Sequence, residues 1–342
     1  MPALKKLRAL LPLPAALLAG CNTVLMNPSG DVANQQGQLI VVSTVLMLLI
    51  IIPMIGLTIF FAWRYRQSNK EATYSPEWDH STGLELIIWA APLLIIIALG
   101  AVTWISTHTL DPYRRLSRLD ATRALAVDAK PLVVEVVALD WKWLFIYPEQ
   151  GIAVVNELAA PVDVPITFKI TASTVMNSFF IPSLAGQIYA MPGMETRLHA
   201  VMNKPGEYEG FSSNYSGAGF SDMKFKFHGL SQADFDKWLA TAKASGKAMS
   251  REDYLKLEKP SEREPIAHYG NVEPELFDAV INRCVEKSKT CMNQMMAMDA
   301  KRHWRVANAD SPAAARTAIE AMVCTVDNPD GKLISRANPS KQ

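Results

Sequence analysis

Hydrophobic residues are concentrated in the first 110 positions of the chain, where they form three segments. The second and third segments, residues 39–63 and 86–105, contain no charged residue and are apolar on every side. At about 1.5 Å per residue, a helix of either length reaches across a hydrocarbon core of about 30 Å. A helix that is apolar all round does not suit the surface of a small soluble domain. The pattern therefore predicts two transmembrane helices, over residues 39–63 and 85–110, joined by a loop at 64–84.

The first apolar segment, residues 9–18, is too short to span a bilayer. It contains two prolines and follows a basic N-terminus, which is typical of a signal peptide over residues 1–20. The peptide ends in LAGC, the order that bacterial lipoprotein processing requires, so we expect Cys21 to carry lipid and residues 21–38 to lie outside the membrane. The alternative, an ordinary signal peptide followed by a chance cysteine, is disfavoured by that order.

The distribution of basic residues sets the expected orientation. The loop at 64–84 carries several Lys and Arg residues, whereas residues 22–38 carry none, so the positive-inside rule places the loop in the cytoplasm. Arg114, Arg115 and Arg118 argue the other way, but they precede a large domain, and large domains translocate largely regardless of charge. We therefore expect a multi-pass protein of a bacterial inner membrane with its C-terminal domain in the periplasm.

Beyond the second span, apolar residues no longer follow one another continuously but recur at every second position. The stretches PITFKIT and MKFKFH alternate apolar and polar residues, which is typical of half-buried strands. Proline and glycine turn signals separate the strands, and several short strands at such spacing favour a Greek-key β-sandwich over residues 111–229. In ALDWKWLFIY, four aromatic residues are expected on one face of a single strand: Trp141, Trp143, Phe145 and Tyr147.

Helical signals follow the strands, so we expect a short helical extension over residues 230–286. Ser231 can cap a first helix that Gly246 would stop. A second amphipathic helix is predicted from Pro274 to about Glu286. The tail at 287–342 is rich in Met, Ala and Lys, and its structure is left open. The first helix would bury Phe235, Trp238 and Leu239, and the second would bury Phe277, Val280, Ile281 and Cys284.

The chain has four cysteines, of which Cys284, Cys291 and Cys324 remain if Cys21 is lipidated. In an oxidising compartment these three allow one disulfide, whose pairing the sequence leaves open. Cys284 and Cys291 would lie about 10 Å apart in a continuous helix, too far for a bond, so pairing them requires the helix to end between them. Cys291 and the methionines after it have soft sulfur atoms that suit Cu(I), but a Met-rich flexible tail is the preferred interpretation.

The overall net charge of +1 gives no pull toward nucleic acid. Two spans followed by an outer β-domain that contains DWKWLFIYPEQGI and VMNSFFIPSLAGQIYAMPGM form a specific combination. Together with AWRYR, YSPEW and NYSGAGFS, it closely resembles subunit II of the bacterial cytochrome bo-type ubiquinol oxidases, which belong to the haem-copper oxidases. The resemblance runs from the lipobox to roughly residue 285. It implies a cupredoxin-like outer domain in a subunit of a proton-translocating terminal quinol oxidase.

Relatives in this superfamily that oxidise cytochrome c bind a dinuclear copper centre, called CuA, in subunit II. The resemblance aligns its ligand pattern, a His followed by Cys-x-Glu-x-Cys-x-x-x-His-x-x-Met, with this chain. Only the Met is kept. A lone thioether cannot hold two coppers, so we expect no metal there and no catalytic residue in this chain. The aligned positions hold Asn177, Ser212, Asn214, Ser216, Phe220 and Met223.

Without CuA, entry of electrons from cytochrome c is closed, whereas a lipid-soluble quinol can donate within the membrane. The resemblance implies that haems, copper and the ubiquinol site lie in subunit I, and that this chain binds none of them and supports the assembly of subunit I. Its expected partners are subunit I, the other subunits of the complex and membrane lipid. Glu85 starts the second span. It either favours the helix dipole or, as the resemblance implies, lies at a cytoplasmic proton entrance, which we favour.

Two other functions compete with this interpretation. The first is the electron-entry subunit of a cytochrome c oxidase, against which the missing Cys and His ligands argue. The second is a stand-alone membrane-tethered binding lipoprotein, which would not be purified together with haem.

Overall fold

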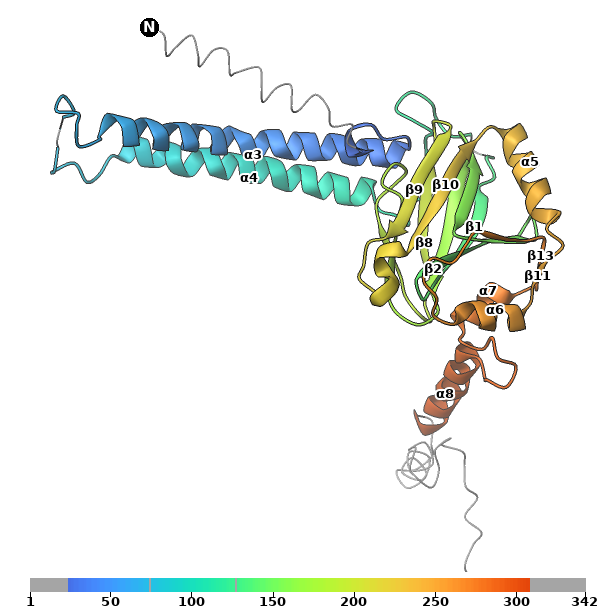
Figure 1. Cartoon of the computed structure of the whole chain (residues 1–342). Helices are drawn as coiled ribbons and strands as arrows, with labels where there is room; N and C mark the ends of the chain where they lie inside the picture. The colour runs from blue at the N-terminus through green and yellow to red at the C-terminus, as the bar shows by residue number, and fades with distance from the viewer. Residues whose placement is uncertain (1–23, 74, 127, 308–342) are drawn as a thin grey trace, which may run out of the picture.

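The protein has two parts, a long helical hairpin and a β-sandwich followed by short helices (Figure 1). The computed structural model describes residues 24–73, 75–126 and 128–307. The predicted signal peptide, the predicted lipidation site Cys21 and Cys324 lie outside the described residues.

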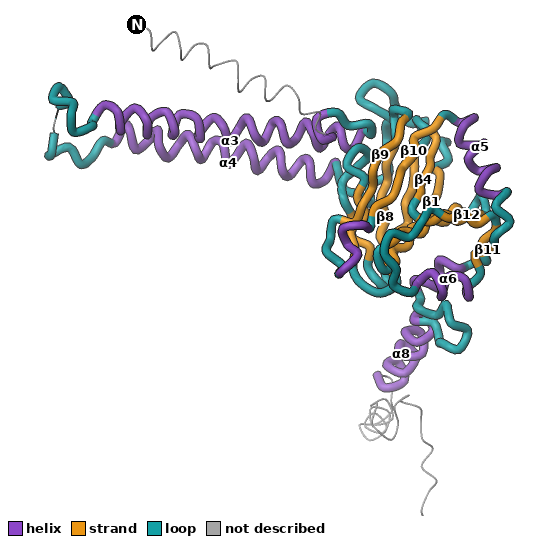
Figure 2. The backbone as a smooth tube through the Cα atoms, in the orientation of Figure 1, coloured by secondary structure: helices purple, strands orange, loops and turns teal. Residues whose placement is uncertain are grey.

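The hairpin consists of α3 (Asp31–Arg64) and α4 (Thr82–Thr109), which lie side by side (Figure 2). Both helices are long and apolar enough to cross a membrane, and their most apolar stretches are not buried within the chain. A short 3-10 helix, η1 (Val24–Met26), precedes them. The predicted spans are therefore helical, as expected from their all-round hydrophobicity.

Helix α3 begins at Asp31, eight residues before the predicted span, so the segment at 21–38 is in part helical. Its first turns are polar and do not need the membrane, because they pack against the sandwich. The Gly30 amide donates to the Ser183 carbonyl at 2.8 Å, and the Ala33 amide donates to Leu184 at 3.3 Å. A Cβ on Gly30 would lie 2.3 Å from the Leu184 carbonyl oxygen, so only glycine allows this approach.

The sandwich is built from two main sheets. The first has the order β12-β3-β2-β1-β5-β8, and the second has the order β4-β10-β9-β6-β7. Most pairs are antiparallel, but β1 pairs with β5 and β10 pairs with β4 in parallel. The strands are β1 (Leu132–Leu139), β2 (Lys142–Tyr147), β3 (Ile152–Val155), β4 (Glu157–Pro161), β5 (Pro165–Ala172), β6 (Asn177–Phe180), β7 (Ile188–Ala190), β8 (Thr196–Val201), β9 (Gly206–Ser212) and β10 (Lys224–Leu230).

The predicted half-burial of PITFKIT and MKFKFH holds for β5 and β10, whereas β2, in ALDWKWLFIY, is buried along its whole length and not on its aromatic face alone. Trp143, Phe145 and Tyr147 enter the core between the sheets, as predicted. Leu144 and Ile146 enter a second cluster beneath the C-terminal helices. A strand covered on both faces loses the alternation that marks a half-buried strand.

The C-terminal extension is more varied than predicted. Helix α5 (Gln232–Lys243) is capped by Ser231, whose Oγ accepts from the Asp234 amide at 3.2 Å, as expected. Helix α6 (Arg251–Glu258) and three strands were not predicted. The added elements are β11 (Ala248–Met249), β12 (Ala267–Tyr269), which joins the edge of the six-stranded sheet, and β13 (Asn271–Val272).

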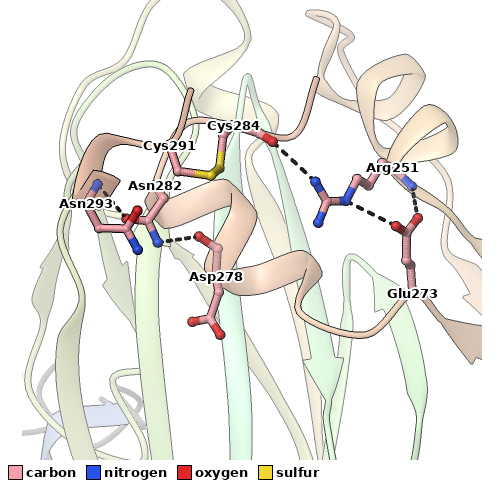
Figure 3. The surroundings of a disulfide bond; sticks show 7 residues. All are labelled: Arg251, Glu273, Asp278, Asn282, Cys284, Cys291 and Asn293. Atoms are coloured by element: carbon pink, nitrogen blue, oxygen red, sulfur yellow. Dashed lines mark hydrogen bonds and ion pairs between the residues drawn. A yellow bond between two sulfur atoms is a disulfide. The ribbon is translucent and has the colours of Figure 1, made fainter. Parts of the chain in front are cut away.

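The predicted second helix is shorter than expected, because α7 covers only Leu276–Ile281. Residues with positive φ stand at both of its ends, Glu275 at 60° and Arg283 at 54°. The turn that follows brings Cys284 and Cys291 into a disulfide with a Cα–Cα distance of 4.8 Å (Figure 3). The tail then continues as α8 (Met292–Ala307), for which the sequence had left the structure open.

Candidate functional site

The clearest polar site of the sandwich lies where β6 begins and β9 ends. Asn177 and Ser212 are 1% and 3% exposed. The Ser212 Oγ lies 3.1 Å from Asn177 Oδ1, to which it donates, and the Asn177 Nδ2 donates to the Val175 carbonyl at 3.2 Å. The Ser178 amide approaches the Ser212 Oγ at 3.4 Å. The pair is neutral, buried and satisfied by local partners, as buried polar groups generally are.

The other aligned positions surround this pair. The Ser212 amide donates to the Met223 carbonyl at 3.2 Å, and the Asn214 Nδ2 donates to the Met176 carbonyl at 3.1 Å. Met223 is buried, at 1% exposed. Phe220 lies in η2 (Ala218–Asp222), and its ring meets that of Tyr215 edge-on at 5.5 Å. The structure thus gathers the predicted positions into one loop region. We call residues 212–223 together with Asn177 the copper-type loop.

Trp141 holds this loop in shape, a role that its predicted place in a strand did not suggest. Its φ of 63° takes it out of the strand, and its Nε1 donates to the Ser216 carbonyl at 3.0 Å. A Cβ on Gly219 would lie 2.6 Å from the indole ring, and one on Gly217 would lie 3.2 Å away. The Gly-x-Gly spacing in NYSGAGFS is the sequence signal that could have indicated this contact with Trp141, because glycines allow such close approach.

The copper-type loop does not fit a dinuclear copper centre. Such a centre needs thiolate and imidazole ligands. The positions offer hydroxyl, amide and phenyl groups, with one buried thioether on Met223. Across the described ranges, no three His, Cys, Asp or Glu residues gather in a way that could hold a metal ion.

Glu85 lies in the first turn of α4, at the end of the hairpin remote from the sandwich (Figure 1). Its Oε1 lies 2.7 Å from His80 Nδ1, and the two side chains are 52% and 62% exposed. The other ring nitrogen of His80 lies 3.1 Å from the Thr82 hydroxyl. The sequence singled out the carboxylate and missed its histidine partner, which precedes the helix in an irregular segment.

A buried ion pair joins the hairpin to the sandwich. Asp31 Oδ2 accepts from Arg118 Nε at 2.9 Å and from Gln35 Nε2 at 2.7 Å. The Asp31 side chain is only 1% exposed, whereas that of Arg118 is 40% exposed. Arg118 thus neutralises a buried charge at the start of α3. The sequence marked this arginine only as an exception to the positive-inside rule.

A second cluster that the sequence missed lies at the opposite edge of the sandwich. Glu157 on β4 meets His228 Nε2 at 3.2 Å and His268 Nε2 at 2.6 Å. The Trp238 Nε1 donates to the same carboxylate at 3.2 Å. These side chains come from β4, β10, β12 and α5, so the cluster connects both sheets with the extension.

The comparisons with known proteins agree with this architecture. Residues 149–229 match the family "Cytochrome C oxidase subunit II, periplasmic domain", and residues 243–288 match the "COX Aromatic Rich Motif". The outer domain is therefore a cupredoxin-like domain of the oxidase subunit II class. The periplasmic domain of subunit II of cytochrome oxidase from Bradyrhizobium japonicum aligns at 23% identity and a TM-score of 0.33. That alignment covers 35% of this chain and 98% of that structure.

The particular family follows from more similar relatives. "Cytochrome bo(3) ubiquinol oxidase subunit 2" of Pseudomonas putida is 53% identical over 78% of this chain and 82% of the relative. "Ubiquinol oxidase subunit 2" of Acetobacter aceti is 50% identical over 78% of this chain and 84% of the relative. The chain therefore belongs to the family of subunit 2 of the ubiquinol oxidases, and the resemblance inferred from its motifs is confirmed.

Proposed function

We propose that this chain is the subunit II of a membrane-bound quinol oxidase and that it supports subunit I without carrying electrons itself. The observation that carries the second part is the pairing of Ser212 with Asn177. Two of the positions where relatives of the cytochrome c branch ligate copper, Asn177 and Ser212, here satisfy each other by a hydrogen bond. Quinol oxidation, the haems and the oxygen-reducing copper then belong to the partner subunit.

Purification of the tagged chain from its native membranes tests this function. The expected result is a complex that contains haem and a subunit I, and that reduces oxygen with a quinol but not with reduced cytochrome c. Oxidation of cytochrome c at a comparable rate would overturn the proposal in favour of an electron-entry subunit. Recovery of the chain without haem would instead indicate a stand-alone binding lipoprotein.

We further propose that the sandwich faces the periplasm, that Cys21 carries the lipid anchor, and that Glu85 helps load protons from the cytoplasm. Support for the last role comes from the His80–Glu85 pair at the exposed start of α4. An imidazole 2.7 Å from a carboxylate provides two adjacent groups that exchange protons with water. Such a pair can collect protons at the mouth of a path that continues in subunit I.

The variant Glu85→Gln keeps the size of the side chain and removes its charge. We expect quinol-driven oxygen uptake by the purified complex to fall several-fold while haem content per protein stays unchanged, because the amide can neither bind a proton nor attract one by its charge. Glu85→Asp should keep more activity. The matched control is Glu77→Gln in the same loop, which should leave turnover unchanged. Full turnover in the Glu85→Gln variant would show that Glu85 has no role in proton loading and acts only as a charge at the start of the helix.

A further inference from the structure

A cavity of about 230 Å³ lies at the outer end of the hairpin, where the sandwich begins. It lies between the first turns of α3, the last turn of α4 and the segment 110–118 that leads into the sandwich. Its lining combines the amides of Gln35 and Gln36 with the apolar side chains of Val32 and Leu110. The lining of the cavity is thus both polar and apolar. The cavity lies where α3 begins and α4 ends, and both helices expose apolar side chains.

The basic residues of this cavity are only partly neutralised. Arg118 is engaged by the buried Asp31, whereas Arg114 and Arg115 are exposed and form no ion pair with any described residue. The one other carboxylate in the lining is Asp111, whose Oδ1 accepts from the Tyr113 amide at 2.8 Å. Counting two free arginines against Asp111 leaves one net positive charge.

His199 also lines the cavity and lies close enough to Arg115 to be affected by its positive charge. Its pKa is lowered, first by burial and then by the charges of Arg115 and Arg197. The lowered pKa favours the neutral imidazole, so His199 adds no further positive charge to the cavity. Its Nδ1 lies 3.1 Å from the Thr167 hydroxyl. Arg114 and Arg115 remain the groups that can attract one.

The cavity lies next to the sandwich-side ends of two helices that are long and apolar enough to cross a membrane. Trp104, in the last turns of α4, is 70% exposed, and its ring contacts that of His108 in a tilted arrangement with 4.5 Å between the ring centroids. Tryptophan rings favour the membrane–water interface. Arg114 and Arg115 lie beyond the end of α4, while exposed apolar side chains such as Ile96 and Ile97 precede Trp104 in the helix. An occupant with a negative head and apolar tails would contact both parts.

We propose that this cavity binds the headgroup of an anionic phospholipid from the outer leaflet. Arg114 and Arg115 hold its phosphate, the Gln35 and Gln36 amides hydrogen-bond its glycerol oxygens, and its acyl chains lie along the exposed side of α3 and α4. The lipid would stiffen the joint between the hairpin and the sandwich beside the Asp31–Arg118 ion pair, which lines the same cavity.

Lipid retention by the purified complex tests this assignment. The complex is exchanged from mixed phosphatidylglycerol–phosphatidylcholine vesicles into detergent, and the lipid that stays bound is quantified by mass spectrometry. Wild type should retain phosphatidylglycerol in preference. Because a basic residue at a membrane surface contributes about fivefold in binding, Arg114→Gln with Arg115→Gln should lose most of that preference. The doubly substituted Lys variant should keep most of it.

The control is Lys243→Gln with Lys247→Gln, which removes two charges from an exposed end of α5 and should change nothing. Equal retention by the Arg114/Arg115 double Gln variant would overturn the proposal. Displacement of the lipid by excess inorganic phosphate would show a free-anion site instead. Loss of another subunit with unchanged lipid would show that the arginines meet a protein carboxylate.

A second measurement does not depend on assembly of the variant. Wild-type complex is irradiated with a photoactivatable phosphatidylglycerol, and the labelled peptides are identified. Label is expected within residues 110–118, and label confined to other segments would refute the site. The readouts are lipid and peptide, so this inference can fail while quinol oxidase activity stands, and the reverse.

Discussion

The copper-type loop and the junction between the hairpin and the sandwich, where Asp31 meets Arg118, stabilise buried polar groups in different ways. At the loop, Asn177 and Ser212 are neutral and hydrogen-bonded to each other. At the junction, Asp31 is a buried carboxylate that depends on Arg118 and Gln35, and its Oδ1 has no hydrogen-bond partner among the described residues. A neutral pair can replace a metal site without leaving an unpaired charge, whereas a buried charge requires a fixed partner.

This difference explains how a metal site can be lost while its frame remains. The loop is shaped by Trp141, Gly217 and Gly219, which never needed to touch a metal. Replacing ligands by small polar residues therefore removes chemistry and leaves the backbone in place. The junction has no such freedom, because Asp31 without Arg118 would be a buried charge with no cation beside it.

The largest expected effect is a gain of copper binding at the loop. The variant with Asn177→His, Ser212→Cys, Asn214→Glu, Ser216→Cys and Phe220→His restores thiolate and imidazole ligands beside Met223. After copper reconstitution of the full chain, its absorption and electron paramagnetic resonance spectra should show a mixed-valence dinuclear centre.

The control for this experiment is the same variant with both new cysteines replaced by serine, which should give no such spectrum. A dinuclear signal from wild-type protein would break the comparison, because the loop would then hold copper without thiolates. Failure of the five-residue variant to bind copper, with the fold intact, would show that the frame has moved.

The second effect concerns the junction. Arg118→Met removes the partner of a side chain that is 1% exposed and should lower the free energy of unfolding by about 3 kcal/mol. Asp31→Asn in the same chain should restore much of the loss, because the uncompensated charge is gone. Denaturant unfolding of the chain in detergent, followed by tryptophan fluorescence, measures both, and equal losses in the single and double variants would contradict a buried-charge mechanism.

The third effect concerns the disulfide between Cys284 and Cys291, which fixes the turn before α8 (Figure 3). The methyl group of Met292, the next residue, packs beside Gly193 in the loop after β7. Replacing both cysteines by alanine should cost about 2 kcal/mol of unfolding free energy, as expected for a loop closed by so few residues. Thermal unfolding measures the loss, and no change in the midpoint would mean that packing alone holds the turn. Proteolysis should then begin near residue 287 in the variant but not in wild type.

The smallest effect concerns Glu135 on β1, a partly buried carboxylate with a poorer partner than Asp31 has. Burial raises its pKa, the charges of Asp278 and Glu195 add to that rise, and Lys169 Nζ at 3.7 Å offsets it only in part, so the pKa is about 7. The folded state therefore binds this proton more tightly than the unfolded state, so stability falls as pH rises from about 4.5 to about 7.

Glu135→Gln should remove that slope and stabilise the chain at pH 8 by on the order of 1 kcal/mol, after allowance for solvent screening. Unfolding midpoints measured from pH 4.5 to pH 8 check the effect. The exposed carboxylate Glu149, changed to Gln, is the matched control and should leave the slope in place. A slope unchanged in the Glu135→Gln variant would assign the pH dependence to other groups.

Much of the architecture could be predicted because its signals are local. Continuous hydrophobicity defines a span wherever it occurs, and alternation in PITFKIT and MKFKFH marks β5 and β10 because one face of each strand is buried. The positions of the copper-type loop could be aligned because its motif keeps a fixed spacing. Such features depend on neighbours in the chain, which the sequence displays directly.

The remaining features depend on residues that are distant in the chain. The burial of both faces of β2 is due to helices that begin about 100 residues later, and β12 becomes a strand only because an open sheet edge accepts it. The disulfide pairing depended on where α7 ends, and the roles of Trp141, His80 and Arg118 depended on partners that folding brings near. The sequence by itself determined the spans, the sandwich and the absence of thiolate and imidazole ligands at the aligned positions. Tertiary structure alone decided which polar groups became partners, because hydrogen bonds and ion pairs act only over a few ångströms.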